Sequence, residues 1–320
     1  YAVNVRLKNL TIRNASAGVR AFHTIGCELD QVRIENNRNF GLKSDESTAL
    51  RMIRSIIWKN SSATGGVAVA MSTSDIQIEN SVLWGSPVAV TFDSGSLTVT
   101  NSVLDASGVA GRIYLFSAIS DAASDFQGDY NDYRVKNSAL IAEQQLRVGG
   151  SVPYSDLPAW ISALAVDRHS MAQDPRFANE ITGDFHPQST QGRYANGTWV
   201  TDSANSPLID AGSLNWPSGK ELAPNGGIIN IGAYGNTPQA SMTPTNPPWL
   251  RTIAYNEGGV VTGDILLFWL YGGMGSNDLV TLEYSRDYEV TWQPIASNVP
   301  AGIREFAWDL NSIPLSLAVN

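Results

Sequence analysis

The chain has 320 residues, of which 43% are hydrophobic and only 16% charged, and its formal net charge is −9. This length suits one elongated domain followed by a smaller one. The acidic balance, with no basic stripe, argues against nucleic acid as a partner and against an anionic membrane surface. No stretch approaches the roughly 18 apolar residues of a membrane helix, so we expect no membrane insertion.

The single cysteine, Cys27, excludes an internal disulfide, and we expect it to be a small buried side chain. Charged residues are few, whereas Gly, Ser, Thr and Asn are plentiful, a mixture typical of β-rich extracellular chains. The chain starts at Tyr1, within a segment that we expect to be a strand. We therefore expect it to be cut from a longer chain whose remainder is one of its partners.

Five short segments in the first hundred residues share alternating apolar residues and then a closing polar residue. They lie at residues 10–14, 32–36, 50–54, 76–80 and 97–101, and the closing residue is Asn except for Arg54 in the third. The mean spacing is (101 − 14)/4, or about 22 residues. Alternation predicts strands with one buried face, and Asn tolerates the left-handed backbone of a tight turn. The repeat therefore predicts stacked β-helix coils with an Asn ladder that Arg54 interrupts.

The coils read xIxIxNSxxW and resemble the repeats of secreted bacterial right-handed parallel β-helix proteins with a pectin-lyase-like fold. Five further motifs follow in the usual order: DYNDY at 129–133, DPRF at 174–177, GDFH at 183–186, SPLIDAG at 206–212 and IGAYG at 231–235. The resemblance covers roughly residues 5–242 and implies a secreted or extracellular cell-surface setting. It implies no single reaction, because that fold hosts lyases, hydrolases, epimerases, adhesins and passive stalks.

We therefore predict an all-β protein with a parallel β-helix over residues 1–242. A short helical insertion is expected near 155–165, where apolar residues recur at helical spacing. A Pro-rich linker covers 243–248, and an immunoglobulin-like β-sandwich covers 249–320. Its segment EYSRDYEVTW, residues 283–292, resembles a hairpin common in immunoglobulin-like and fibronectin-like modules. Only 320 − 246 = 74 residues follow Asn246, so we expect the sandwich to be incomplete.

The outward residues of the coils supply the candidate catalytic groups. The alignment stacks Arg33 over Arg51 in one column, and it places Glu35 and Glu79 two coils apart in the next. A lyase acting on uronic acids needs a cation for the substrate carboxylate and a base for the proton. Paired carboxylates could instead serve hydrolysis, although a spacing of roughly 10 Å is at or beyond the inverting range. A solvated face also carries such charges routinely.

Two other sets of residues are weaker candidates. Trp58 and Trp84 occupy equivalent places on adjacent coils, and they are either an exposed platform for sugars or buried packing. Four carboxylates cluster in a turn-rich segment and are either a calcium site or a solvated acidic loop: Asp121, Asp125, Asp129 and Asp132. Calcium is thus the one possible cofactor. Histidines 23, 169 and 186 belong to no recognised catalytic motif.

Three functions remain open. The chain is a noncatalytic structural, adhesive or glycan-binding segment of a larger secreted or cell-surface protein, or a polysaccharide-active lyase, hydrolase or epimerase. The third alternative is a self-assembling filament component, since an uncapped β-helix end exposes strand edges that can stack on another copy. The absence of a catalytic motif favours the first alternative. Its expected partners are polysaccharides or cell-surface glycans.

Overall fold

The computed structural model describes residues 2–60, 66–107, 111–253, 255, 263–287 and 289–312. The chain divides into two compact units, Tyr1–Pro244 and Thr245–Asn320. Tyr288 of the predicted hairpin turn and residues 313–320 of the predicted sandwich lie outside the described residues. In the described part of the chain, no helix has both the length and the apolar character needed to cross a membrane.

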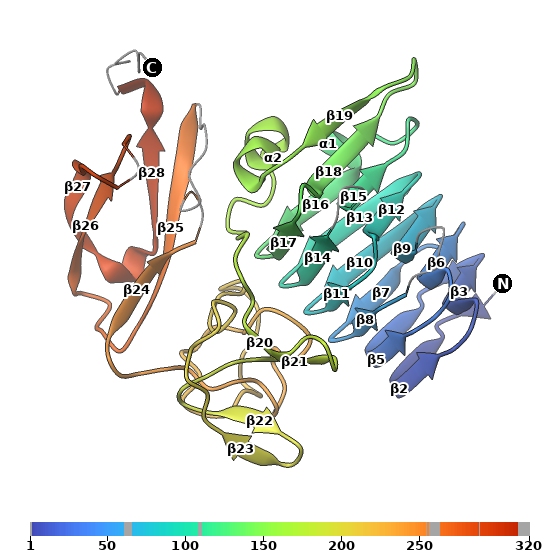
Figure 1. The fold of residues 1–320 in the computed structure, drawn as a ribbon, viewed down its shortest axis with the longest axis horizontal. Coiled ribbons are helices and arrows are strands. Elements are labelled where there is room, and N and C mark those ends of the chain that lie inside the picture. Colours follow the sequence, from blue (N-terminus) through green and yellow to red (C-terminus); the bar gives the residue numbers. More distant parts are fainter. Residues whose placement is uncertain are drawn as a thin grey trace. The chain divides into compact units, whose positions relative to one another are not determined.

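The first unit is a parallel β-helix of about five turns, so the predicted all-β class and β-helix are confirmed. Figure 1 shows its strands stacked side by side in chain order. One large sheet contains β2 (Arg6–Arg13), β5 (Glu28–Glu35), β7 (Leu50–Ile53), β8 (Ile56–Trp58), β10 (Ser74–Glu79), β11 (Val82–Trp84), β13 (Gly95–Thr100), β14 (Val103–Ser107), β16 (Phe126–Asp129) and β17 (Asp132–Lys136).

The second large sheet contains β3 (Ala17–Phe22), β6 (Phe40–Asp45), β9 (Val67–Ser72), β12 (Val88–Phe92), β15 (Arg112–Phe116), β18 (Leu140–Gln145) and β19 (Ser151–Tyr154). All its neighbours are parallel except β18 and β19, which form an antiparallel pair at one end. Two short strands, β1 (Ala2–Val3) and β4 (Thr24–Ile25), pair where the coil passes from the second sheet back to the first.

The coils bend at two columns of residues with positive φ, the left-handed region that Asn tolerates better than most residues. The first column contains Asn9, Gln31, Arg54, Asn80, Asn101 and Tyr130, and the second contains Asn14, Asn36, Lys59 and Gly85. Asn is therefore common at both bends, but both columns also accept other residue types.

The register corrects the predicted repeat. β5 pairs with β7 through residues 28–30 and with β8 through residues 33–35, so one strand faces two consecutive short ones. Arg54 is therefore the neighbour of Gln31 on the next coil, in the first column, and Lys59 is the neighbour of Asn36 on the next coil, in the second column. The prediction placed the closing residues of all five segments in one column. In the structure, the closing residues of the first two segments lie at the second bend and those of the last three lie at the first bend. The predicted column is therefore wrong between the second and third coils. The cause is that apolar alternation looks the same on both sides of a bend.

Buried polar ladders run along the β-helix beside these bends. The backbone N–H of Val32 donates to Ser55 Oγ, that of Ser55 to Ser81 Oγ and that of Ser81 to Ser102 Oγ, each at 3.1 Å. At the other bend, Asn37 Nδ2 donates to Asn60 Oδ1 at 2.9 Å. At the first bend, Asn101 Nδ2 donates to Asn80 Oδ1 at 3.5 Å, as predicted for these two Asn residues. Amide pairs therefore occur at the first bend and one residue after the second bend. These side chains satisfy backbone groups that the strand ladders leave unpaired at the bends.

The interior is filled by apolar side chains and closed at one end by a helix. α2 (Leu157–Leu164) is capped at its N-terminus by Asp156, whose carboxylate accepts a hydrogen bond from the N–H of Ala159 at 2.9 Å. Trp160 is fully buried and stacks on Tyr114 with centroids 6.0 Å apart. A four-residue helix, α1 (Ala122–Asp125), precedes β16. The indole of Trp160 donates to buried Asp167, which anchors α2 to the end of the core.

The part of the first unit that follows α2, residues 165–244, folds back on the outer face of the large sheet and is called the covering segment. It contains two hairpins, β20 (Phe177–Asn179) with β21 (Asp184–Pro187) and β22 (Arg193–Ala195) with β23 (Thr198–Val200), and long irregular stretches. Phe177 packs against Trp84 with ring centroids 5.2 Å apart, and Phe185 packs against Trp58 at 6.1 Å. This covering segment explains why outward residues of the middle coils, such as Val82 and Val103, are fully buried.

The second unit consists of antiparallel sheets. β25 (Asp264–Gly272) lies between β24 (Trp249–Thr252) and β28 (Glu305–Asp309), while β26 (Leu279–Tyr284) pairs with β27 (Gln293–Pro300). Short 3₁₀ helices, η1 (Ala301–Ile303) and η2 (Leu310–Ser312), flank β28. The two sheets share a small core of Trp269, Leu282 and Val299.

Candidate functional site

The candidate catalytic residues lie on the outer face of the large sheet, but not in the predicted columns. Arg33 is in register with Ile56, and Arg51 is in register with Glu28, so the two arginines are not stacked. Glu35 is in register with Trp58, whereas Glu79 is in register with residues 53 and 100. The predicted stacking of these four residues is therefore wrong, for the same reason as the merged bends.

Each of the four residues is held in an ion pair. Arg33 Nε lies 2.5 Å from Glu35 Oε2, and Arg51 binds both carboxylate oxygens of Glu79 at 3.1 and 2.5 Å. Arg33 also donates to the carbonyl oxygen of Gly183 at 3.0 Å. The hydrogen bonds that Arg51 donates to Glu79 are the largest influence on Arg51 and raise the pKa of its guanidinium. The donor groups of both guanidinium ions are therefore engaged by neighbouring carboxylates.

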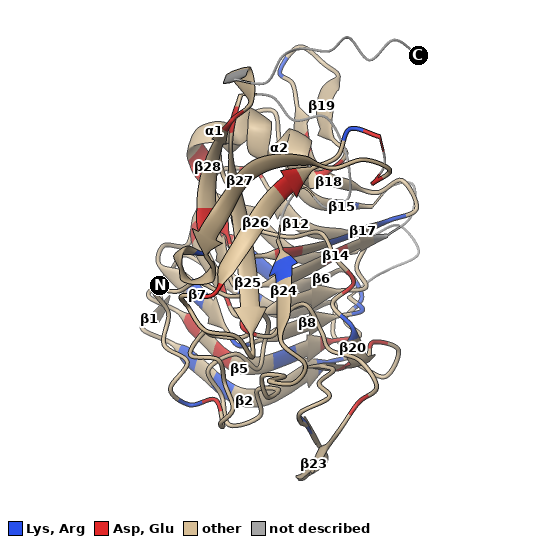
Figure 2. Ribbon diagram, turned by 90° about the vertical axis from the view of Figure 1, so that its left-hand side faces the viewer, with Lys and Arg blue, Asp and Glu red and all other residues tan. Residues whose placement is uncertain are grey.

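The ion pairs continue along the first coils (Figure 2 shows Lys and Arg together with Asp and Glu on β2 and β5). Arg6 pairs with Glu28 at 2.5 Å, and Asp30 is held between Lys8 at 2.9 Å and Arg54 at 2.6 Å. Burial opposes ionisation of Asp30, but its hydrogen bonds from Lys8 and Arg54 outweigh burial and lower its pKa. The charged columns of this face are therefore largely neutralised by their neighbours.

The two candidate tryptophans are covered. Trp58 and Trp84 are each 8% exposed, because Phe177 and Phe185 of the covering segment lie against them. Arg33 and Lys59 also lie over the Trp58 ring, at 5.0 and 4.4 Å from its centroid. Neither indole has a face free to stack on a sugar, so the packing alternative describes them.

The four candidate calcium ligands hold separate parts of the backbone. Asp121 caps α1, and Asp125 accepts a hydrogen bond from the N–H of Asp121 at 2.8 Å. Asp129 accepts from His169 Nδ1 at 2.7 Å, and Asp132 accepts from the N–H of Gln173 at 2.9 Å. Within the described ranges, no group of three or more His, Cys, Asp or Glu side chains has the arrangement of a metal site.

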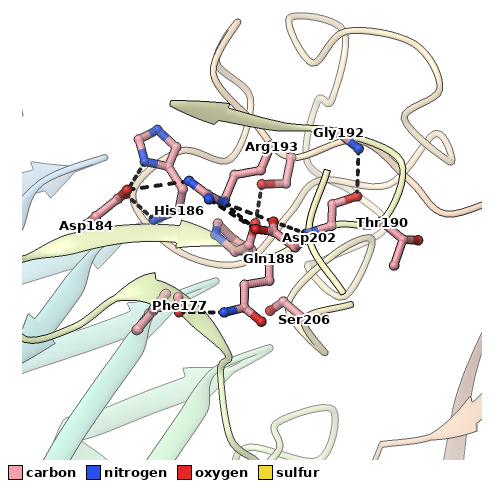
Figure 3. Close-up of polar contacts among 12 residues, drawn as sticks. Phe177, Asp184, His186, Gln188, Thr190, Gly192, Arg193, Asp202 and Ser206 are labelled. Atoms are coloured by element: carbon pink, nitrogen blue, oxygen red, sulfur yellow. Dashed lines mark hydrogen bonds and ion pairs between the residues drawn. The ribbon is translucent and has the colours of Figure 1, made fainter. Parts of the chain in front are cut away.

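A compact cluster of polar residues lies in the covering segment (Figure 3). His186 Nδ1 is 2.6 Å from Asp184 Oδ1, and Arg193 Nη1 is 3.5 Å from the other oxygen of that carboxylate. Arg193 also binds Asp202, with Nε and Nη2 both within 3.2 Å of its oxygens. Burial is the largest single influence on Asp184 and opposes its ionisation, but the hydrogen bonds from His186 and the nearby positive charge of Arg193 together outweigh burial and lower its pKa.

A carboxylate that orients an imidazole is a familiar element of acid–base catalysis. Here, however, the imidazole of His186 stacks on Tyr234 with centroids 3.5 Å apart, and its Nε2 is buried with no hydrogen-bond partner among the described residues. A base must reach the proton that it removes. This cluster therefore acts in the present conformation as a clamp that joins β21, β22 and the loop at residue 202.

A third group of residues lines an open cleft of about 830 Å³ at the second bend of the first three coils. Its polar lining consists of Asn14, Ser16, Asn36, Asn37, Arg38 and Lys59. All of these except Asn37 are exposed. The Lys59 ammonium donates to the carbonyl oxygen of Ile181 at 3.0 Å, which fixes it at the cleft wall. The lining contains two cations and no carboxylate, although the chain as a whole is acidic.

Sequence reasoning identified Asn14 and Asn36 only as turn residues and missed the cleft. A signal was available, because basic residues sit at or beside consecutive bends: Asn36-Asn37-Arg38 on one coil and Lys59-Asn60 on the next. They are recognised as neighbours only in the register that places Lys59 beside Asn36 on adjacent coils. The predicted repeat has a different register at this point. Asp105 was also missed: it is 5% exposed, and burial raises its pKa to about 6.

Comparison with known proteins gives one result. A family model described as "Disaggregatase related" matches residues 162–212. This range includes the last three residues of α2, both hairpins of the covering segment and the cluster of Asp184, His186, Arg193 and Asp202. No curated protein and no solved structure matches the chain.

Proposed function

We propose that this chain is a noncatalytic, glycan-binding segment of a larger secreted or cell-surface protein, and that its ligand is an acidic polysaccharide. The open cleft carries this proposal. Amide and hydroxyl side chains hydrogen-bond sugar hydroxyls, and Arg38 and Lys59 supply positive charge for carboxylate or sulfate groups. The cleft runs across coils whose spacing is about 4.8 Å, so an extended chain can contact several coils at once.

Two further observations support a binding role. The candidate catalytic residues are held in ion pairs, and Nε2 of His186 is buried, so neither of these two groups presents an assembled acid–base pair to a substrate. The matched family is described as disaggregatase related, which fits a chain that engages the material holding aggregates together. The resemblance to secreted pectin-lyase-like β-helices, with an immunoglobulin-like module as the second unit, belongs to the same proposal.

Binding is tested by isothermal titration of the full chain with polygalacturonate as the acidic probe and dextran as the neutral one. The double variant Arg38→Gln/Lys59→Gln should bind polygalacturonate at least about tenfold more weakly, because each charge-assisted hydrogen bond contributes roughly 1.5–3 kcal/mol before solvent screening. Arg20→Gln, which removes an exposed cation outside the cleft, is the matched control and should bind like the parent. Equal affinity for dextran, or an unaffected double variant, would contradict the proposal.

A polysaccharide-active enzyme is the second candidate, and Asp105 is the observation that favours it. A carboxyl group with a pKa near 6 can donate a proton to a leaving group close to neutral pH. A reducing-end assay and the ultraviolet absorbance of unsaturated lyase products, both on polygalacturonate, separate the candidates. Product formation that Asp105→Asn abolishes would establish catalysis, whereas retention without product would support binding alone.

A further inference from the structure

Two Asn-Gly pairs occur in the sequence, Asn196-Gly197 and Asn225-Gly226, and both lie in the covering segment. The side-chain amide of asparagine can be attacked by the backbone nitrogen of the following residue, which closes a succinimide ring. Glycine hinders this attack least, because it has no Cβ and its backbone rotates freely. The structure places the two pairs in different surroundings, so it distinguishes a reactive asparagine from a protected one.

Asn196 and Gly197 form the two-residue turn of the β22–β23 hairpin, since Ala195 is in register with Thr198, and this turn lies at the outside of the covering segment (Figure 1). Both turn residues have positive φ, 48° for Asn196 and 90° for Gly197, as a type I′ turn requires. Both are exposed, and the side chain of Asn196 makes no hydrogen bond with any residue that the structure describes. A Cβ added at Gly197 would meet no described atom within 4 Å. No described contact therefore holds the Asn196 amide away from the Gly197 nitrogen.

Asn225, in contrast, is held at both ends of its amide. Its Oδ1 accepts a hydrogen bond from the N–H of Gly227 at 3.2 Å, and its Nδ2 donates to the carbonyl oxygen of Glu221 at 3.0 Å. The backbone of Gly226 lies against the carboxylate of Asp210, because a Cβ at this glycine would collide with Oδ2. Attack by the Gly226 nitrogen would break both hydrogen bonds, and it would create an anionic nitrogen close to a carboxylate, which the like charge disfavours.

We propose that Asn196 is a site of spontaneous deamidation in the folded chain, whereas Asn225 keeps its amide. The Gly197 nitrogen loses its proton to hydroxide and forms a bond with Cγ of Asn196. The bond from Cγ to the side-chain nitrogen breaks, so ammonia leaves with a proton taken from water, and a succinimide remains. Water then opens this ring at either carbonyl group and gives aspartate or isoaspartate. One water is consumed for each ammonia released, and no oxidant or reductant takes part.

The two products change the hairpin in different ways. Isoaspartate lengthens the backbone of the turn, because the chain then passes through Cβ and Cγ of residue 196. A tight turn fixes the register of the strands that it joins, so we expect isoaspartate to weaken the pairing of Ala195 with Thr198. Aspartate leaves the backbone unchanged and adds a negative charge at the exposed tip. Arg193 pairs with Val200 at the other end of the hairpin and with Asp202 beyond it, so the covering segment should keep this ion pair.

Peptide mapping by mass spectrometry tests the proposal on the full chain, incubated at pH 8 and 37 °C and sampled over several weeks. Trypsin cleavage at Arg193 and Lys220 places the two asparagines in different peptides. The peptide containing Asn196 should convert from amide to acid at least about tenfold faster than the peptide containing Asn225, because only the latter amide is held by hydrogen bonds. Isoaspartate, identified by electron-transfer fragmentation, should appear at residue 196. In guanidinium chloride the two peptides should convert at similar rates, since the unfolded chain retains only the local Asn-Gly sequence.

Asn196→Gln is the matched control, because glutamine keeps an amide but would have to close a larger ring that forms much more slowly. Its peptide should keep its mass, while the peptide containing Asn225 behaves as in the parent. Equal conversion of both asparagines in the folded chain would show that the contacts of Asn225 give no protection, and it would overturn the proposal. Conversion of Asn196 in guanidinium chloride but not in the folded chain would also overturn it, because the turn would then protect this residue. A persistent amide at residue 196 under both conditions would exclude the reaction.

Discussion

Glu221 is a buried carboxyl group whose ionisation should set much of the pH dependence of the first unit. The side chain is 5% exposed, and its Oε1 accepts hydrogen bonds from the N–H groups of Asn230 and Asn236 at 2.9 and 2.7 Å. Oε2 is buried and has no hydrogen-bond partner among the described residues. Burial, reinforced by the nearby carboxylate of Asp210, raises the pKa of Glu221 to about 8.

A raised carboxyl pKa means that the folded state holds the proton more tightly than the unfolded chain. The contribution to stability is therefore complete below the unfolded pKa of 4.5 and is lost as the pH rises from 4.5 to about 8. Each pH unit in this window costs about 1.4 kcal/mol, so the free energy of unfolding falls by roughly 3 kcal/mol between pH 5 and 7.5. Glu221→Gln reproduces the neutral acid in shape and keeps the oxygen acceptor, so it should remove this dependence.

Urea unfolding of the parent and of Glu221→Gln, measured at several pH values from 4.5 to 8, tests the reasoning. The two proteins should be nearly equal at pH 4.5, and the variant should be more stable by roughly 3 kcal/mol at pH 7. Glu283→Gln, which removes an exposed carboxylate of β26, controls for the loss of one charge and should show no such trend. A constant difference between parent and Glu221→Gln across this range would refute protonation of Glu221 in the folded state.

Three further substitutions address the β-helix itself. Asp167→Ala should destabilise the first unit by about 3–5 kcal/mol, measured by urea unfolding, because four buried donors lose their common acceptor. Ser81→Ala should cost about 1–3 kcal/mol in the same assay, since the buried N–H of Ser55 loses its partner; a neutral result would show that the hydroxyl ladder contributes nothing. Arg51→Ala should cost about 1–3 kcal/mol, because the side chain of Glu79 is only 9% exposed and both its oxygens lose their hydrogen bonds from Arg51; a neutral result would mean that water replaces the guanidinium at no cost.

The register predicted between the second and third coils is wrong, because the apolar alternation does not mark a bend that lies within β5. In β5, the apolar side chains at 29, 32 and 34 lie on both sides of a bend at Gln31, so alternation alone does not mark the bend. The third coil divides the same path into β7 and β8, and the motif ending in Arg54 belongs to the first of these. Aligning by motif therefore matched the wrong half of the strand. The error misplaced the candidate site, because it brought Arg33 over Arg51 and separated Asn36 from Lys59.

The sequence by itself determined the kind of coil, because alternating apolar residues and left-handed Asn are local properties of the chain. It also determined the position of the helix, since α2 has its own cap and apolar spacing, but it predicted the β-helix to continue to residue 242, whereas the described parallel coils end at β17 and β18. Only the tertiary structure decided which outward residues are accessible. The covering segment buries Trp58 and Trp84 through contacts between residues more than 90 positions apart in the sequence. The ion pair of Arg193 with Asp202 then holds the segment together from within. Burial of an outward side chain depends on what lies over the sheet, and that information is not contained in the periodicity of the strand.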